Sequence, residues 1–156
     1  NSLSTYQSIN AEINAMESSS LIFMVRMGSN IVTPLPSGSG GSTTFNTSTN
    51  QIDINIGTSS AFSTRQIVAH EFTHGYQYLS GDLDFNSTGV GGGFFYDQTD
   101  EIAAFERTNL FGNPVDVTST INTSYGIVDK GPKSFHLLTP TEQNQYQREK
   151  AKGKYH

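Results

Sequence analysis

The chain has 156 residues, a formal net charge of −5, no cysteine and no tryptophan. This length suits one domain spanning residues 1–156, with a hydrophobic core large enough to need no disulfide or structural metal. The lack of cysteine excludes a thiol nucleophile and a cysteine-ligated zinc site, so any metal chemistry has to use histidine and carboxylate. The mild acidity argues against nucleic acid as a partner, because no basic stripe is available to neutralise phosphates.

Small polar residues are abundant, whereas charged residues make up only 15% of the chain. This composition favours an extracytoplasmic or secreted protein. The longest apolar run, residues 21–25, is far shorter than the ~20 residues that a membrane-spanning helix needs, so we expect no membrane span. The chain begins at Asn1 without a signal-peptide pattern, which predicts a processed product or an excised domain. Nothing demands a partner subunit, and a monomer is the default expectation.

Hydrophobic periodicity predicts one helix and two strands in the first part of the chain. Residues 4–18 carry apolar side chains at intervals of three and four, which predicts an amphipathic helix. Residues 21–27 are short, apolar and partly β-branched, as in a buried strand. Residues 51–57 alternate three isoleucines with Asp53 and Asn55, which predicts a half-solvated strand at a sheet edge.

The clearest predicted helix follows, between Ser63 and Gly81. Ser63 and Gln66 have the spacing of a capping box, in which each side chain satisfies a free backbone N–H group. Gly81 has the place of a C-terminal cap. This helix contains an HExxH motif, which begins at His70 and ends at His74.

The rest of the chain predicts two more helices. The glycine-rich residues 86–95 indicate a loop. Residues 100–111 form a second helix with Thr99 as its cap. Residues 113–138 show only short strand or loop pieces, and residues 139–156 predict a polar helix with a basic end and a tail.

The HExxH motif is typical of a metal site. Residues four apart lie on one helix face, so the imidazoles of His70 and His74 can converge on one ion. Glu71 lies about 100° round the helix, where its carboxylate can hold water on the ion without being a ligand. Zinc lowers the pKa of such a water to about 7, and the carboxylate then acts as general base. The alternative is a helix with two surface histidines and a solvated glutamate.

On these residues the chain resembles the HExxH zinc metallopeptidases, which have the zincin fold. In that family a twisted sheet with an edge strand beside the cleft precedes the motif helix, and a later helix supplies a third ligand. The EIAA stretch that starts at Glu101 is similar to the glutamate-zincin pattern, in which Ala or Ser follows the ligand by three positions. The resemblance covers about residues 21–111. It implies an α+β zincin-like fold, with Zn²⁺ held by His70, His74 and Glu101.

Other third ligands stay open. Asp100 or Asp97 would make the chain similar to the aspartate-zincins, although their GTxDxxYG motif is missing and only its end is echoed, by residues 124–126. The metzincin extension is absent, because no third histidine follows the motif at the required spacing. Glu101 itself could simply favour the helix macrodipole from the first turn.

Peptide hydrolysis also needs a group that stabilises the oxyanion. Tyr125 and His136 are the candidates, because both lie downstream of the predicted ligand helix. The simpler interpretation is a packing role for Tyr125 and a core position bonded to backbone for His136. The segment 120–126 gives a weaker resemblance to small bacterial zinc-peptidase domains of effector and polymorphic-toxin proteins.

The sequence therefore predicts a zinc-dependent endopeptidase acting on a protein or peptide, in which Glu71 activates water. We expect the substrate to lie extended along the strand at residues 51–57, as edge strands permit. One alternative is a zinc amidase acting on a cell-wall or other non-peptide link. Another is an inactive or structural domain that keeps zinc for stability.

Overall fold

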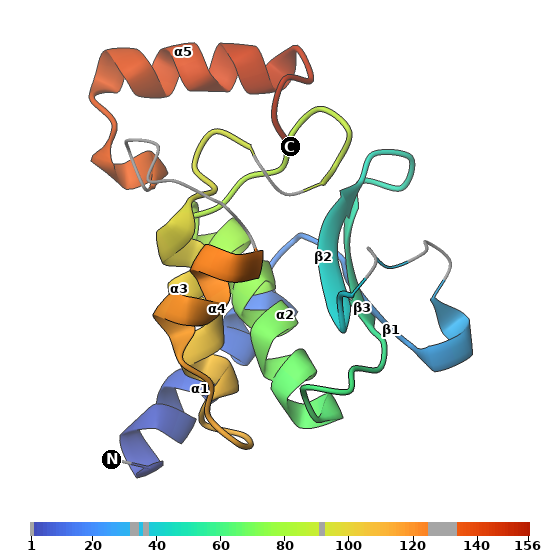
Figure 1. Cartoon of the computed structure of the whole chain (residues 1–156). Helices are drawn as coiled ribbons and strands as arrows, with labels where there is room; N and C mark the ends of the chain where they lie inside the picture. The colour runs from blue at the N-terminus through green and yellow to red at the C-terminus, as the bar shows by residue number, and fades with distance from the viewer. Residues whose placement is uncertain (1, 32–34, 36–37, 91–92, 125–133) are drawn as a thin grey trace.

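The computed structural model of the chain describes residues 2–31, 35, 38–90, 93–124 and 134–156. It confirms the α+β class, with helices on one side of a small mixed sheet (Figure 1). Within the described residues the elements are, in chain order, α1 (Ser2–Ser18), β1 (Phe23–Met27), β2 (Gly41–Asn46), β3 (Gln51–Ile56), α2 (Thr64–Ser80), α3 (Gln98–Thr108), α4 (Val117–Ser124) and α5 (Pro140–Ala151). None of the described helices is long and apolar enough to cross a membrane.

The sheet has the strand order β1-β3-β2, with β1 parallel and β2 antiparallel to β3. The expectation of an edge strand at residues 51–57 is therefore wrong, because β3 is the central strand. Its polar residues are also buried rather than solvated: Asp53 is 3% exposed and Asn55 1%. Arg26 on β1 pairs with the Asp53 carboxylate at 2.6 Å, and Gln51 donates to it at 2.8 Å. These partners offset the cost of burying a charge.

The core lies between the sheet and α2, which stands between the sheet and the helices α3 and α4 in Figure 1. Ile52, Ile54 and Ile56 are at most 1% exposed and share one face of β3. They pack with Ile67 of α2 in one apolar cluster. Burying a side chain of this size stabilises a fold by about 1.5–3 kcal/mol. One face of α2 is thus fixed on the sheet, and another is left for polar side chains.

The limits of α2 are those predicted. Ser63 and Gln66 form the capping box, and Gly81 ends the helix in the left-handed region at φ 83°. The N-cap of α3 is Asp97, so the prediction of Thr99 is wrong. The Asp97 carboxylate accepts from the Thr99 N–H at 2.6 Å, and the Asp100 carboxylate accepts from the Asp97 N–H at 2.8 Å.

The C-terminal part forms a second apolar cluster above the first. Tyr146 of α5 packs with Phe95 and Leu138, and all three are at most 8% exposed. The polar helix predicted within residues 139–156 is confirmed as α5, which begins at the Thr139 cap. The segment 113–138, expected to hold only strand or loop pieces, contains α4 as well.

Candidate metal centre

Two helices bring three candidate ligands together. His70 and His74 lie one turn apart on α2, and Glu101 lies in the first turn of α3, which packs against α2. The two imidazole Nε2 atoms are 3.2 Å apart. Each imidazole lies 3.4 Å from the Glu101 carboxylate, His70 from Oε2 and His74 from Oε1. These three residues form the group that could hold a metal ion among the described residues.

The spacing of this group fits the size of a tetrahedral zinc site. Zinc binds imidazole nitrogen and carboxylate oxygen at about 2.0–2.2 Å. Ligands at that radius, at the corners of a tetrahedron, are about 3.3–3.6 Å apart. The Nε2–Nε2 separation of 3.2 Å and the two nearest Nε2–carboxylate distances of 3.4 Å, one to each oxygen of Glu101, lie at or close to that range, and one ligand atom from each residue lies within 4.8 Å of the others. The side chains therefore converge without the large movement that a scattered group would need.

A hydrogen-bond relay fixes the ring of His74. Gln77 donates its amide N–H to the carbonyl of Asp100 at 3.0 Å, which leaves its Oε1 as an acceptor. That oxygen lies 2.8 Å from His74 Nδ1. The ring therefore carries a proton on Nδ1 and presents Nε2 to the centre, the arrangement that metal-binding histidines use.

Thr108 does the same for His70. Its hydroxyl donates to the carbonyl of Ala104 at 2.9 Å, so its oxygen can accept from His70 Nδ1, 3.4 Å away. The unprotonated Nε2 atoms of His70 and His74 then point their lone pairs towards each other. Two lone pairs at 3.2 Å repel unless a cation lies between them.

The electrostatics also favour positive charge at this point. Burial lowers the pKa of His74, but the Glu101 carboxylate outweighs it and raises that pKa to about 9. Burial raises the pKa of Glu101, but the charges of His74 and His70 outweigh it and lower that pKa. The carboxylate is therefore ionised, and the centre attracts a cation.

Glu71 lies beside this group and is held by the sheet. It is 6% exposed, and burial raises the pKa of its carboxyl. The hydroxyl of Thr43 on β2 lies 2.8 Å from Glu71 Oε2. Gly41 on the same strand leaves room for the side chain, because a Cβ there would stand 2.8 Å from both Cγ and Oε1 of Glu71. The edge strand β2 thus sets where this carboxylate points.

The other predicted site residues lie elsewhere. Asp97 and Asp100, the alternative third ligands, cap α3 with each other and are not part of the His-His-Glu group. His136 bonds the Ser80 carbonyl at 3.0 Å, at the far end of α2. The expected backbone bond is thus present, but His136 is exposed, so its expected core position is wrong. Tyr125 lies outside the described residues.

The sequence did not indicate four residues around the site: Gln77, Thr108, Thr43 and Tyr96. Gln77 and Thr108 could have been found, because they lie three residues after His74 and seven after Glu101, on the same helix faces. Thr43 and Tyr96 give no such signal, since only the tertiary fold brings them close to the site.

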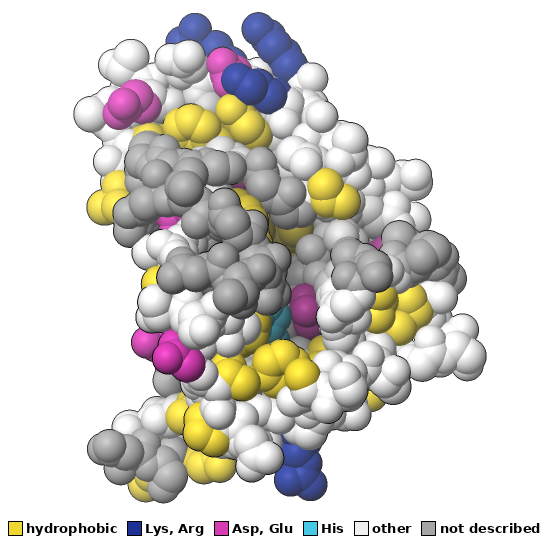
Figure 2. Space-filling model, viewed as in Figure 1, with side chains coloured by type: hydrophobic (Ala, Val, Ile, Leu, Met, Phe, Trp, Pro, Cys, Tyr) yellow, Lys and Arg dark blue, Asp and Glu magenta, His cyan; other side chains and the backbone are white. Residues whose placement is uncertain are grey.

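In Figure 2 a histidine surface and an acidic one are visible together in a hollow of the molecular surface.

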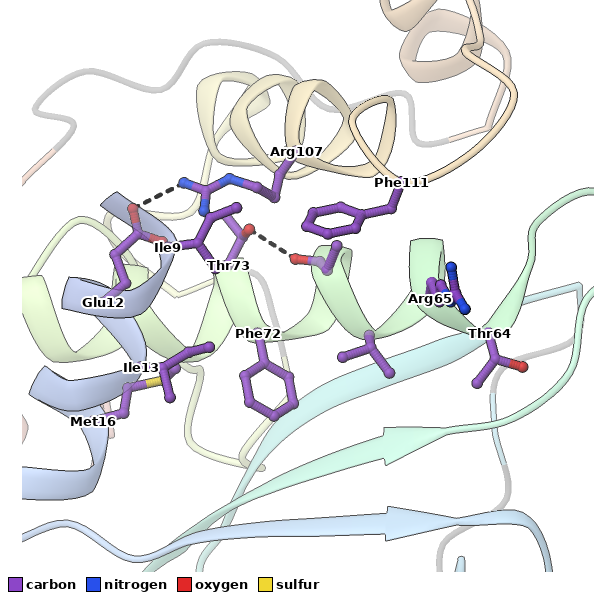
Figure 3. A pocket seen from close by; sticks show the side chains of 12 residues that line it. Ile9, Glu12, Ile13, Met16, Thr64, Arg65, Phe72, Thr73, Arg107 and Phe111 are labelled. Carbon is purple, nitrogen blue, oxygen red and sulfur yellow. Dashed lines mark hydrogen bonds and ion pairs between the residues drawn. The ribbon is translucent and has the colours of Figure 1, made fainter. Parts of the chain in front are cut away.

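An apolar groove of about 350 Å³ lies between α1, α2 and α3 (Figure 3). It includes Val68 and Phe72, which are about 200° round α2 from His70. At its rim Glu12 and Arg107 pair with each other at 2.8 Å. The groove is thus separate from the metal group and offers it no ligand.

Comparison with known proteins gives no further identification. The chain matches no protein-family model, no curated protein and no solved structure.

Proposed function

We propose that this chain is a zinc-dependent endopeptidase of the glutamate-zincin type. One observation carries the proposal: His70, His74 and Glu101 converge at the spacing of zinc ligands, while Glu71 stands beside them outside the ligand group. A structural zinc site has four protein ligands, whereas a catalytic site has three and an open position. Three ligands among the described residues, with an adjacent carboxylate, favour catalysis over a structural role.

Each residue of the site has a separate role in the proposed reaction. His70, His74 and Glu101 would hold zinc, which supplies Lewis acidity towards the substrate carbonyl and acidifies water. Glu71 takes a proton from the attacking water and passes it to the leaving amine. Gln77 and Thr108 keep both imidazoles in the tautomer that presents Nε2. Burial, which raises the pKa of Glu71, brings this carboxyl closer to the range in which a group both accepts and returns a proton.

The substrate strand is reassigned from β3 to β2. A central strand cannot pair with a peptide, and β2 is the edge strand that contacts Glu71. The Phe45 N–H points out from this edge and donates to Gly89 at 2.7 Å, and the Gly41 N–H donates to Ser39 at 3.2 Å. Thr43 lies between these two residues, and its backbone N–H and C=O also point out from the edge, because such groups alternate along an antiparallel pair. An extended peptide would bond there, next to the general base.

The test combines metal content with peptide cleavage. We expect one zinc per chain by elemental analysis, and cleavage of a peptide library that a chelator abolishes. Glu71→Gln should keep the zinc and lose about 10²–10⁴-fold in kcat, the range for a general base. A chain that binds zinc tightly but cleaves no peptide would contradict the endopeptidase and favour a structural site. The composition leads us to propose an extracytoplasmic setting, and the resemblance at residues 120–126 leads us to propose a bacterial effector or toxin type of domain.

A further inference from the structure

The Glu101 carboxylate receives a hydrogen bond from outside the metal group. Tyr96, directly before the N-cap of α3, places its hydroxyl 2.5 Å from Glu101 Oε1. This is the short end of the range for a hydroxyl that donates to an ionised carboxylate. The bond therefore joins Tyr96 to the charged form of Glu101.

The two oxygens of Glu101 differ in their partners. Oε1 accepts from Tyr96, whereas Oε2 is buried without a hydrogen-bond partner among the described residues. Oε2 lies 3.4 Å from His70 Nε2 and Oε1 lies 3.4 Å from His74 Nε2, so both oxygens face the metal group and they differ in the bond from Tyr96. A buried carboxylate oxygen without a donor is costly, so it points to a cation as its partner.

The backbone on both sides of Tyr96 is fixed. On one side Phe95 is 1% exposed, and its N–H donates to the Asp84 carboxylate at 3.1 Å. On the other side Asp97 is held in the capping box of α3. The hydroxyl of Tyr96 is thus delivered to Glu101 by a segment that is anchored at each end.

We propose that Tyr96 is a positioning residue for the metal ligand Glu101, an inference that rests on the metal site of the proposed function. By donating to Oε1, Tyr96 leaves Oε2 as the oxygen without another partner, and it holds the carboxylate at the angle at which Oε2 alone binds the metal. Partners of this kind set the orientation of metal ligands, and their loss typically weakens metal binding 10–100-fold.

The test compares Tyr96→Phe with Tyr146→Phe. The second variant is a matched control, because Tyr146 is also a buried tyrosine beside a buried carboxylate, that of Asp84, outside the metal group. Zinc affinity is measured by competition with a chromophoric chelator, and geometry by the visible spectrum of the cobalt-loaded protein. We expect Tyr96→Phe to weaken zinc binding 10–100-fold and to change the cobalt spectrum. Tyr146→Phe should do neither.

A double-mutant cycle with Glu101→Gln shows whether Tyr96 acts through Glu101. The two substitutions should be clearly non-additive in zinc affinity, whereas additive effects would overturn the proposal. Melting of both tyrosine variants in excess chelator checks that the fold is kept. A measurement on the unmodified protein gives independent evidence. Zinc should shift the infrared bands of the Glu101 carboxylate, which are identified by their absence in Glu101→Gln. The splitting between these bands should be the wide one that is typical of a carboxylate bound through one oxygen.

The possible failures can be told apart. If Tyr96→Phe keeps the zinc affinity and the cobalt spectrum of the wild type, the role of Tyr96 is refuted and the zinc site is not affected. The narrow infrared splitting of a carboxylate bound through two oxygens would refute the role of Tyr96 in the same way. Failure of the wild-type protein to bind zinc would refute the proposed function together with this inference.

Discussion

Removal of the Thr43 hydroxyl tests how β2 holds the proposed general base. Thr43→Val keeps the shape of the side chain but deletes the group that lies 2.8 Å from Glu71 Oε2. Glu71 is 6% exposed, so water replaces the lost partner poorly. A hydrogen bond to a charged group is worth about 1.5–3 kcal/mol, and an unsatisfied buried acceptor costs a similar amount. We therefore expect unfolding free energy to fall by about 1–3 kcal/mol.

The same loss should appear in catalysis. If the bond persists in the transition state, 1.5–3 kcal/mol corresponds to about 10–150-fold in kcat/KM. Thr44→Val is the matched control, because Thr44 is the next residue on β2 and points to the opposite face of the sheet. Both changes raise β-propensity alike, so their difference isolates the hydroxyl. Equal denaturant unfolding curves and equal peptide hydrolysis for the two variants would refute the reasoning.

Three further predictions concern the same site and its surroundings. Gly41→Ala places a Cβ 2.8 Å from the Glu71 carboxylate, so kcat should fall while zinc stoichiometry stays at one; unchanged kcat would contradict this close approach. Burial raises the pKa of Asp84 from 3.8 to about 6, so the folded state binds this proton more tightly than the unfolded state. The free energy of unfolding should therefore fall by about 3 kcal/mol as the pH rises from about 4 to 6. Asp84→Asn should remove this component from denaturant midpoints measured across that range, and an unaltered pH profile would disprove it. Zinc at about 100 times its Kd should add about 2.7 kcal/mol to the stability of the wild type, and clearly less to Glu101→Gln in the same thermal melts.

The local signals in the sequence were sufficient for α2 and its motif. The Ser63–Gln66 capping box, the apolar periodicity and Gly81 all act within a few residues, so they can be read without the fold. The cap of α3 was misplaced by two residues, because Asp97 and Thr99 are both good N-caps. The structure uses Asp97, with Asp100 in the return position that Glu or Gln more often has.

The position of β3 could not be predicted from its alternation. Polar residues at every second place indicate solvent, yet Asp53 and Asn55 are buried because Arg26, 27 residues earlier, pairs with Asp53. The strand β2 was not predicted, because the hairpin turn between it and β3 lacks an Asn-Gly signal. It turns instead through Asn50, at φ 56°.

The site was predictable only as far as sequence spacing reaches. His70, Glu71 and His74 belong to one helix, so their convergence follows from helix geometry. Glu101 was favoured by resemblance, and its placement beside the histidines depends on how α3 packs on α2. Helix α4 was missed because VTSTINTS is rich in β-branched and other weak helix formers.

The placement of the ligands on two helices has a consequence for a chain without cysteine. A metal bound by His74 and Glu101 would act as a cross-link that closes a loop of 26 intervening residues. The chain-entropy relation for disulfides assigns such a loop about 3.5 kcal/mol at 25 °C. Release of the metal would free the segment between α2 and α3 first, and a protease should cut there before it cuts the sheet. Under the proposed function, the ion would therefore serve both catalysis and the fold, as a removable cross-link between α2 and α3.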